Sequence, residues 1–215
     1  MIPLNDLNYT GQPNLTLLRD IIATVLDVTI ISWSHLLASK EVNAKSSEPD
    51  IAGRLGRAMI AEKNRRNLKN FRIEEEIGTR SALDAPRTEG RIDIKIIYSF
   101  DEREYFGIEC KRVSGKSKAL AKKYVDQGVM RFVTGKYSPN HEWSAMLGFV
   151  IDGDVDGCIN LVRGCLVKAH KTNCMTGKWA TEKNLISYQH LYRTSHRQNI
   201  HKSMVTILHL FLTIE

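Results

Sequence analysis

Hydrophobic periodicity divides the first third of the chain into two helices. Apolar residues at helical spacing predict a long helix over 14–39 and a second helix that begins at Ser47 and runs to about Asn70. Ser47 is a suitable N-cap, and Asp50 follows it three residues later, as in a capping box. The polar stretch 40–47 between the two helices is typical of a linker.

Alternation of apolar and polar residues indicates strands in the next part of the chain. Residues 91–98 and 105–113 alternate along their length, and the short polar connector 99–104 predicts that they form a hairpin. A shorter strand is expected over 71–77, followed by a loop over 78–90 that is rich in Gly, Pro and Asp. This region therefore predicts three consecutive strands.

The rest of the chain continues with both kinds of element. We expect a helix, a strand, a second helix and two final strands, over 117–133, 145–151, 158–171, 185–192 and 205–213. The order from Glu48 to Ile151 is α-β-β-β-α-β, which predicts an α/β fold. We expect a single domain, 1–215, made of an N-terminal helical extension, a core and a C-terminal extension with a helix and a hairpin, over 1–47, 48–151 and 152–215.

Composition and targeting signals indicate a cytoplasmic globular protein with no membrane partner. With 42% hydrophobic and 26% charged residues, the chain can bury a core. No apolar run approaches the roughly 18–20 residues of a membrane span, and Met1–Asp6 lacks the features of a signal peptide. The cysteines form no CxxC pair and are expected to be free thiols: Cys110, Cys158, Cys165 and Cys174.

The arrangement of charge is more informative than the net charge of +7. An acidic block over 73–110 is flanked by strongly basic blocks over 51–72 and 111–136. Basic blocks suit a phosphate backbone, whereas concentrated carboxylates repel phosphate unless a cation lies between them. Solvated helix faces would explain any single block equally well, but the alternation as a whole favours a metal-using nucleic-acid protein.

The hairpin brings together residues that can support chemistry. If the chain turns at Asp101–Glu102, Asp93 lies opposite Glu109 to Lys111, with all three side chains on one face. Two carboxylates beside an ammonium can hold Mg²⁺, and a water on that cation is a suitable nucleophile for attack on phosphorus. The outer face of an ordinary half-solvated hairpin carries similar charges, so spacing alone leaves both interpretations open.

These residues carry a family resemblance. Gly90-Arg91-Ile92-Asp93-Ile94 followed by Phe106-Gly107-Ile108-Glu109-Cys110-Lys111-Arg112 resembles the D…(D/E)xK signature of the PD-(D/E)XK nuclease superfamily. The resemblance covers about half of the chain, 48–151, and implies a restriction endonuclease-like core, an αβββαβ unit with a mixed central sheet flanked by helices. Ile92 stands where the proline of the signature would be.

The resemblance also implies an activity and roles for individual residues. Asp93 and Glu109 would ligate the metal, and the backbone carbonyl of Cys110 would add a ligand. Lys111 would orient or activate the attacking water and stabilise the charge that develops on phosphorus. The expected activity is hydrolysis of phosphodiester bonds by an Mg²⁺-activated water, with Mn²⁺ able to substitute for Mg²⁺ and DNA favoured over RNA as substrate.

Members of the superfamily often add a glutamate from the first core helix. At about 100° per residue, Glu48 shares the apolar, core-facing stripe of Leu55 and Met59. Glu62 lies on the same stripe, whereas Asp50 points away and is explained as a cap. We therefore prefer Glu48 as a catalytic residue and keep Glu62 as the alternative.

The second core helix offers candidates for phosphate contacts. Gln127 and Arg131 lie one turn apart, with Tyr124 one turn before them. They are candidates to bind nucleic acid, or else form a surface pair beside a core tyrosine. A rim of lysines that could contact phosphate, or simply be solvated, consists of Lys116, Lys118, Lys122 and Lys123.

The sequence contains no recognisable DNA-reading module. Specificity would then come from a homodimer, a partner subunit or the structure of the substrate. Segments 124–132 and 135–138 resemble bacterial nuclease-like proteins, some of them associated with phage defence, which suggests an antiviral role. The alternative function is that of a non-catalytic nucleic-acid-binding or assembly subunit that retains the nuclease fold.

One further motif is set aside. Asp152-Gly153-Asp154-Val155-Asp156-Gly157 matches the first half of a calcium-binding EF-hand loop. Arg163 occupies the twelfth position, where that loop needs a bidentate glutamate. We therefore expect a turn from strand to helix at this position.

Overall fold

The structure is a computed structural model of the chain. It describes residues 15–79, 90–99, 104–139, 141–169, 174–199 and 202–214. Most of the predicted loop 78–90, most of the connector 99–104 and the last residues of the predicted helix 158–171 lie outside the described residues.

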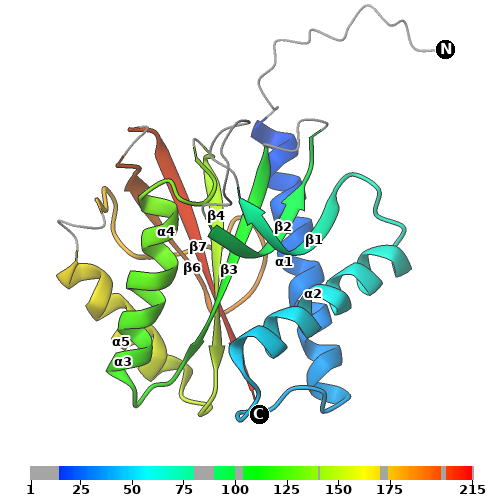
Figure 1. Ribbon diagram of the computed structural model, residues 1–215, viewed down its shortest axis with the longest axis horizontal. Coiled ribbons are helices and arrows are strands. Elements are labelled where there is room, and N and C mark those ends of the chain that lie inside the picture. The colour runs from blue at the N-terminus through cyan, green and yellow to red at the C-terminus, as the bar shows by residue number, and fades with distance from the viewer. Residues whose placement is uncertain are drawn as a thin grey trace, which may run out of the picture.

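A mixed β-sheet forms the centre of the described part of the chain (Figure 1). Its seven strands are β1 (Arg72–Thr79), β2 (Gly90–Ile97), β3 (Tyr105–Val113), β4 (Trp143–Val150), β5 (Ala180–Thr181), β6 (Leu191–Arg197) and β7 (Met204–Thr213). They are arranged in the order β1-β2-β3-β4-β7-β6-β5. β3, β4 and β7 run parallel to one another, and the other neighbours pair antiparallel. The predicted α/β class is therefore confirmed.

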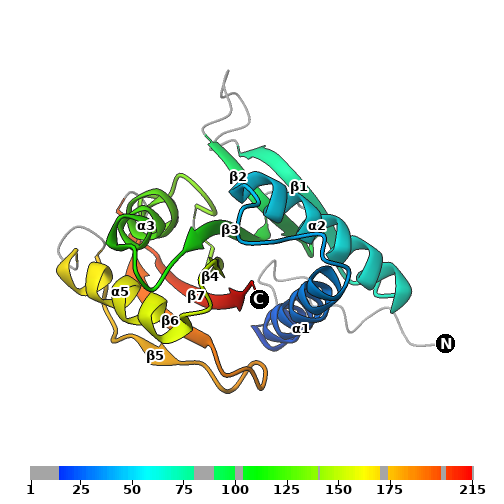
Figure 2. The ribbon, with the colours of Figure 1, turned by 90° about the horizontal axis from the view of Figure 1, so that it is seen from below.

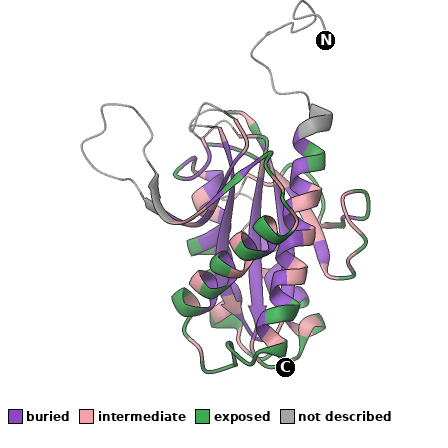
Figure 3. Cartoon of the chain, turned by 90° about the vertical axis from the view of Figure 1, so that its right-hand side faces the viewer, coloured by how far each residue is buried: buried purple, intermediate pink, exposed green. Residues whose placement is uncertain are grey.

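Helices cover both faces of this sheet (Figure 2). One face packs against α1 (Leu15–Ala38) and α2 (Glu48–Arg65). The other packs against α5 (Val155–Lys168) and a continuous helical segment made of α3 (Lys118–Tyr124), the π-helical turn η2 (Val125–Val129) and α4 (Met130–Val133). The strands and the inner sides of the helices are buried, whereas exposed residues lie on the outer sides (Figure 3).

The element order predicted between Glu48 and Ile151 is confirmed, and the boundaries differ where local hydrogen bonds override periodicity. The second helix ends at Arg65 instead of about Asn70, because Arg66 caps it and Asn67 has a positive φ of 53°. At the start of this helix, the Ser47 side chain accepts a hydrogen bond from the Asp50 N–H, so the predicted N-cap is confirmed.

The expected turn from strand to helix at 152–157 is confirmed. Asp154 caps α5, and its side chain accepts a hydrogen bond from the Gly157 N–H at 2.9 Å. Asp152 accepts hydrogen bonds from the Ser114 hydroxyl at 2.6 Å and from the Gly115 N–H at 3.2 Å. The Asp154 cap starts the helix at Val155, earlier than apolar periodicity predicts, because a polar cap is not part of the apolar stripe.

The C-terminal segment is integral to the sheet. β7 lies between β4 and β6 and pairs with β4 from Trp143–Thr206 to Val150–Thr213. The strand predicted over 185–192 is wrong in position, because β6 pairs with β7 only from Leu191 onward. Leu185, Ile186 and Tyr188 pack against the core without joining a strand, which explains their apolar pattern.

Within the described residues, α1 is the one helix long and apolar enough over Leu18–Ala38 to cross a membrane. The expectation of no membrane span was based on uninterrupted apolar runs in the sequence. The finding for α1 differs because a run ends at each polar residue, whereas the mean hydropathy of a helix includes its polar residues. Half of the stretch is buried in the fold. Trp33 stacks on Phe149 and donates its Nε1–H to the Thr213 carbonyl at 2.9 Å. This is the packing of a core helix and is compatible with a soluble protein.

Candidate active site

The site lies where β2 and β3 separate. The two strands pair from Ile97–Tyr105 to Ile94–Ile108. Beyond that point β2 continues to pair with β1, and β3 continues to pair with β4 as far as Val113. The edge of β3 that faces β2 therefore presents backbone groups that no strand partner satisfies.

Two carboxylates satisfy the N–H groups along this open edge. The Cys110 N–H donates to Asp93 Oδ2 at 2.6 Å, and the Arg112 N–H donates to Glu48 Oε2 at 3.0 Å. Asp93 reaches the edge from β2, and Glu48 reaches it from the first residue of α2. The cap at Ser47 determines where α2 begins and so places Glu48 at this point.

Lys111 joins the acidic residues into one cluster. Its Nζ donates to Glu109 Oε1 at 2.7 Å, to Glu48 Oε1 at 3.0 Å and to the Cys110 carbonyl at 2.7 Å. An ammonium has three donors, so these contacts use all of them. The Lys111 side chain is only 7% exposed, so the ammonium is almost completely removed from solvent.

Glu109 is incompletely paired. Its Oε1 accepts hydrogen bonds from Lys111 and, at 3.2 Å, from Arg131, whereas its Oε2 is buried without a hydrogen-bond partner. Burial and then the negative charge of Asp93 raise the pKa of Glu109 to about 7, despite the opposing effects of Lys111 and Arg131. Burial also raises the pKa of Asp93. For Lys111, burial acts to lower the pKa, but Glu109, Glu48 and Asp93 together raise it.

Tyr137 contacts the cluster through Arg131, and sequence reasoning gave it no role beyond its place in the segment 135–138. Arg131 lies over its ring and donates to its hydroxyl, and that hydroxyl donates to the Arg91 carbonyl on β2. Tyr137 is fully buried. Nothing in its spacing from Arg131 indicates that the hydroxyl returns to β2, because that contact depends on the turn after α4.

A π-helical turn brings the second core helix close to Lys111. A Cβ added at Gly128 would lie 2.3 Å from Met146 Cε and 3.6 Å from Lys111 Cγ, so only glycine fits without a shift. Just before this turn, Tyr124 is fully buried, and its hydroxyl lies 3.0 Å from His209 Nδ1 on β7. The helix is thus anchored on the sheet beside the site.

The structure separates the predicted nucleic-acid contacts into two groups. Arg131 contacts Glu109 and is 34% exposed, so it belongs to the site. Gln127 is exposed on η2, and the predicted lysine rim is exposed along α3 and the turn before it, at Lys116, Lys118, Lys122 and Lys123. Lys122 pairs with Asp126 one turn away.

The two candidate helix glutamates have different surroundings. Glu48 contacts Lys111, whereas Glu62 accepts hydrogen bonds from Arg65 at 2.7 Å and Arg66 at 2.5 Å near the other end of α2. Position on the apolar stripe could not separate them. In the structure, Glu48 is the one that lies at the separation of β2 and β3.

The donor atoms at the site fit a hard divalent cation. No three His, Cys, Asp or Glu side chains are grouped as a metal site among the described residues. However, Mg²⁺ is commonly held by one or two carboxylates and keeps several waters. Asp93, Glu109 and the Cys110 carbonyl meet that need, and Glu109 Oε2 is a buried acceptor without a partner.

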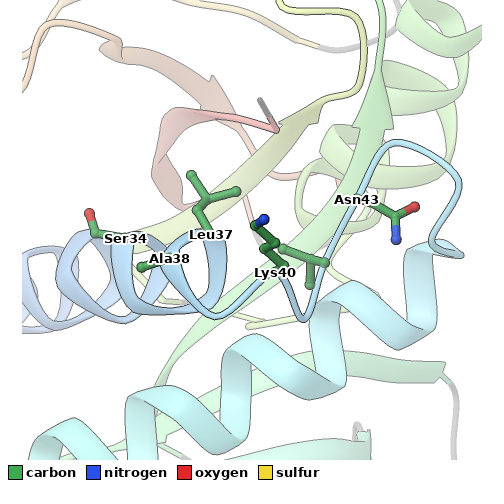
Figure 4. A pocket seen from close by; sticks show the side chains of 6 residues that line it. Ser34, Leu37, Ala38, Lys40 and Asn43 are labelled. Atoms are coloured by element: carbon green, nitrogen blue, oxygen red, sulfur yellow. The ribbon is translucent and has the colours of Figure 1, made fainter.

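A hollow of about 700 Å³ lies beside the linker that leads to Glu48. It is lined by Ser34, Leu37, Ala38, Lys40, Val42 and Asn43 (Figure 4). The adjacent Ala44 carbonyl accepts a hydrogen bond from Arg112 Nη2 at 2.8 Å. This contact ties the linker to β3, but the hollow contains none of the acidic residues of the site.

Comparisons of the chain with protein-family models, with curated proteins and with solved structures find no match. The PD-(D/E)XK resemblance therefore rests on the residues themselves.

Proposed function

We propose that the protein is a metal-dependent nuclease of the PD-(D/E)XK type that hydrolyses phosphodiester bonds, with DNA as the favoured substrate. One observation carries the proposal: Glu48, Glu109 and Lys111 meet where β2 leaves β3, and Asp93 binds the same open edge. A hairpin with charges on a solvated face would not bury Glu109 and Lys111 or leave a buried carboxylate oxygen without a partner.

In this proposal Asp93, Glu109 and the Cys110 carbonyl would hold Mg²⁺. When bound, this cation would lower the pKa of a water and offset the charge of the phosphate. Lys111 supplies an ammonium beside the scissile phosphate, where it orients the attacking water and stabilises developing negative charge. Glu48 positions Lys111 through the 3.0 Å contact. Arg131, which is partly exposed next to Glu109, would contact a phosphate oxygen.

At the level of the fold, we propose that α2 to β4 form a restriction endonuclease-like core. The α-β-β-β-α-β order, the antiparallel β2–β3 pair and the parallel β3–β4 pair support this assignment. The proposed site of action is the cytoplasm, and the resemblance of 124–132 and 135–138 suggests anti-phage defence. A homodimer or a partner subunit would supply the specificity.

A cleavage assay tests the proposed activity. Wild type, Asp93→Ala and Lys111→Ala are incubated with plasmid, linear duplex, single-stranded DNA and RNA in Mg²⁺, Mn²⁺ or EDTA. Asp156→Ala and Lys168→Ala are matched controls, because both residues are exposed on α5. We expect cleavage that needs the metal, disappears in both site variants and persists in both controls.

The alternative, a non-catalytic nucleic-acid-binding subunit, is favoured by one observation. The Lys111 ammonium is fully occupied by acceptors, and the described acidic residues do not form a three-residue metal group. If wild type and variants bind DNA equally and cut no substrate with either metal, the nuclease proposal fails and the binding function replaces it. Loss of cleavage in the controls as well would also contradict the proposed site.

A further inference from the structure

The Lys111 ammonium is surrounded as a small cation would be. Three oxygens from three residues lie within 2.7–3.0 Å of Nζ: Glu109 Oε1, Glu48 Oε1 and the Cys110 carbonyl oxygen. Two of these residues, Glu109 and Cys110, also supply donors to the metal site proposed above. The Cys110 carbonyl oxygen and the Glu109 carboxylate are thus offered to two different cations.

We infer that Lys111 occupies the cation position in the metal-free protein, and that a divalent ion binds only by displacing its ammonium. This inference rests on the proposed metal site and adds a competition to it. A metal ion and an ammonium that share the Glu109 carboxylate and the Cys110 carbonyl oxygen would lie within a few ångströms of each other. Their repulsion beside the buried Glu109 side chain makes simultaneous occupation unfavourable.

The surroundings offer the displaced ammonium another position. Glu109 is 1% exposed, whereas the Glu48 side chain is 20% exposed. An ammonium that leaves Glu109 can therefore remain bonded to Glu48 while it turns toward solvent and substrate. Lys111 has a flexible four-carbon stem, which permits this movement without a change in β3. The competition would keep the site closed to metal until Lys111 moves toward the substrate side.

Metal titration tests the competition directly. Mn²⁺ alone is titrated into metal-stripped wild type, Lys111→Met, Lys168→Met and Glu109→Gln, and the dissociation constant is measured by calorimetry and by the electron paramagnetic resonance signal of free Mn²⁺. We expect Lys111→Met to bind Mn²⁺ roughly tenfold more tightly than wild type, because the competing charge is gone. Lys168→Met should match wild type, and Glu109→Gln should bind far more weakly.

The outcomes separate the inference from the proposed function. Equal or weaker binding by Lys111→Met, with binding still lost in Glu109→Gln, overturns the competition and leaves the metal site intact. If no protein binds Mn²⁺, or if Glu109→Gln binds it as tightly as wild type, both the competition and the proposed metal site are overturned. Tighter binding by Lys111→Met supports the competition whether or not any nucleic acid is cut.

A second measurement uses the wild-type protein and so does not depend on whether a variant folds. Lysines are methylated with formaldehyde and cyanoborohydride in EDTA or in Mg²⁺, and each site is quantified by mass spectrometry. Lys111 should react slowly in EDTA and several-fold faster in Mg²⁺, while exposed Lys168 reacts equally in both. Unchanged reactivity of Lys111 under conditions where the metal is bound overturns the inference.

Discussion

Two buried glutamates in this protein have opposite surroundings. Glu62 and Glu109 are 3% and 1% exposed, respectively. Both oxygens of Glu62 accept hydrogen bonds, from Arg65 and Arg66, whereas one oxygen of Glu109 has no partner. Hydrogen bonds from Arg65, reinforced by Arg66, outweigh burial and lower the pKa of Glu62 to about 2. Burial and Asp93 raise the pKa of Glu109 to about 7.

The contrast shows that burial alone does not define the role of an acidic residue. The charge of Glu62 is fully paired, and Arg66 extends the network to Asp27 on α1 at 2.7 Å, so this cluster joins two helices. Glu109 is held beside a second carboxylate and shares a single ammonium with Glu48. A fold tolerates such an unfavourable group most readily where it serves a function. The predictions below test this difference.

The largest expected effect is on cleavage. Glu109→Gln should lower the rate by roughly 10³-fold or more, because it removes a metal ligand from the proposed site. Glu62→Gln should leave the rate within about threefold of wild type, since its partners lie away from the site. Initial cleavage rates of both variants at saturating Mg²⁺, on whichever substrate the cleavage assay identifies, test this prediction. Similar losses in the two variants would remove the functional distinction between the two glutamates.

Replacing an arginine in each cluster gives an intermediate effect. Arg131→Met should reduce cleavage by about tenfold, because Glu109 and a phosphate each lose a charged donor. Arg66→Met should leave cleavage nearly unchanged and lower the unfolding free energy by about 1–2 kcal/mol, since it leaves Glu62 and Asp27 with fewer partners. Cleavage rates and urea denaturation of both variants test this pair. A large loss of stability in Arg131→Met with full activity would contradict the functional role of Arg131 and make its role structural.

The smallest expected effect is on acid stability. Because the folded-state pKa of Glu62 is lowered from 4.5 to about 2, its stabilisation is fully present above pH 4.5 and is lost as the pH falls toward 2. Glu62→Gln should be less stable than wild type by about 1 kcal/mol at pH 7, a modest value because Arg65 is mostly exposed. This difference should vanish toward pH 2.

Urea denaturation across this pH range measures the effect. Glu109→Gln serves as the control. It should lose the stabilisation by Glu62 at low pH as wild type does, because Glu62, Arg65 and Arg66 are intact. A difference between wild type and Glu62→Gln that does not change with pH would mean that the ion pair contributes nothing as a charge interaction.

Local patterns predicted most of the fold because they report local physics. The alternation along 91–98 and 105–113 identified β2 and β3, and Ser47 identified the start of α2. Patterns failed where another interaction dominated. Leu185, Ile186 and Tyr188 are apolar because they pack against the core, yet pairing with β7 begins only at Leu191. Likewise, the pattern over 117–133 predicted a helix but gave no indication of the π-helical turn at 125–129.

For the candidate site, the sequence placed Asp93, Glu109 and Lys111 on one hairpin face and favoured Glu48 over Glu62, but it could not exclude Glu62. Both lie on the buried stripe of α2, and a helical pattern indicates a face without saying what that face meets. Tyr137 was missed for the same reason: its contacts with Arg131 and the Arg91 carbonyl join distant parts of the chain.

The sequence by itself determined which segments form helices and strands, because periodicity and caps act over a few residues. It also determined which charged side chains share a strand face, since alternate residues on a strand point the same way. Only the tertiary structure decided that β2 separates from β3 beyond Ile94 and that Lys111 lies among three oxygens. It also decided that Glu48 and not Glu62 lies at that separation. These outcomes depend on how the sheet pairs and how α2 packs against it, and long-range packing leaves no periodic signal in the chain.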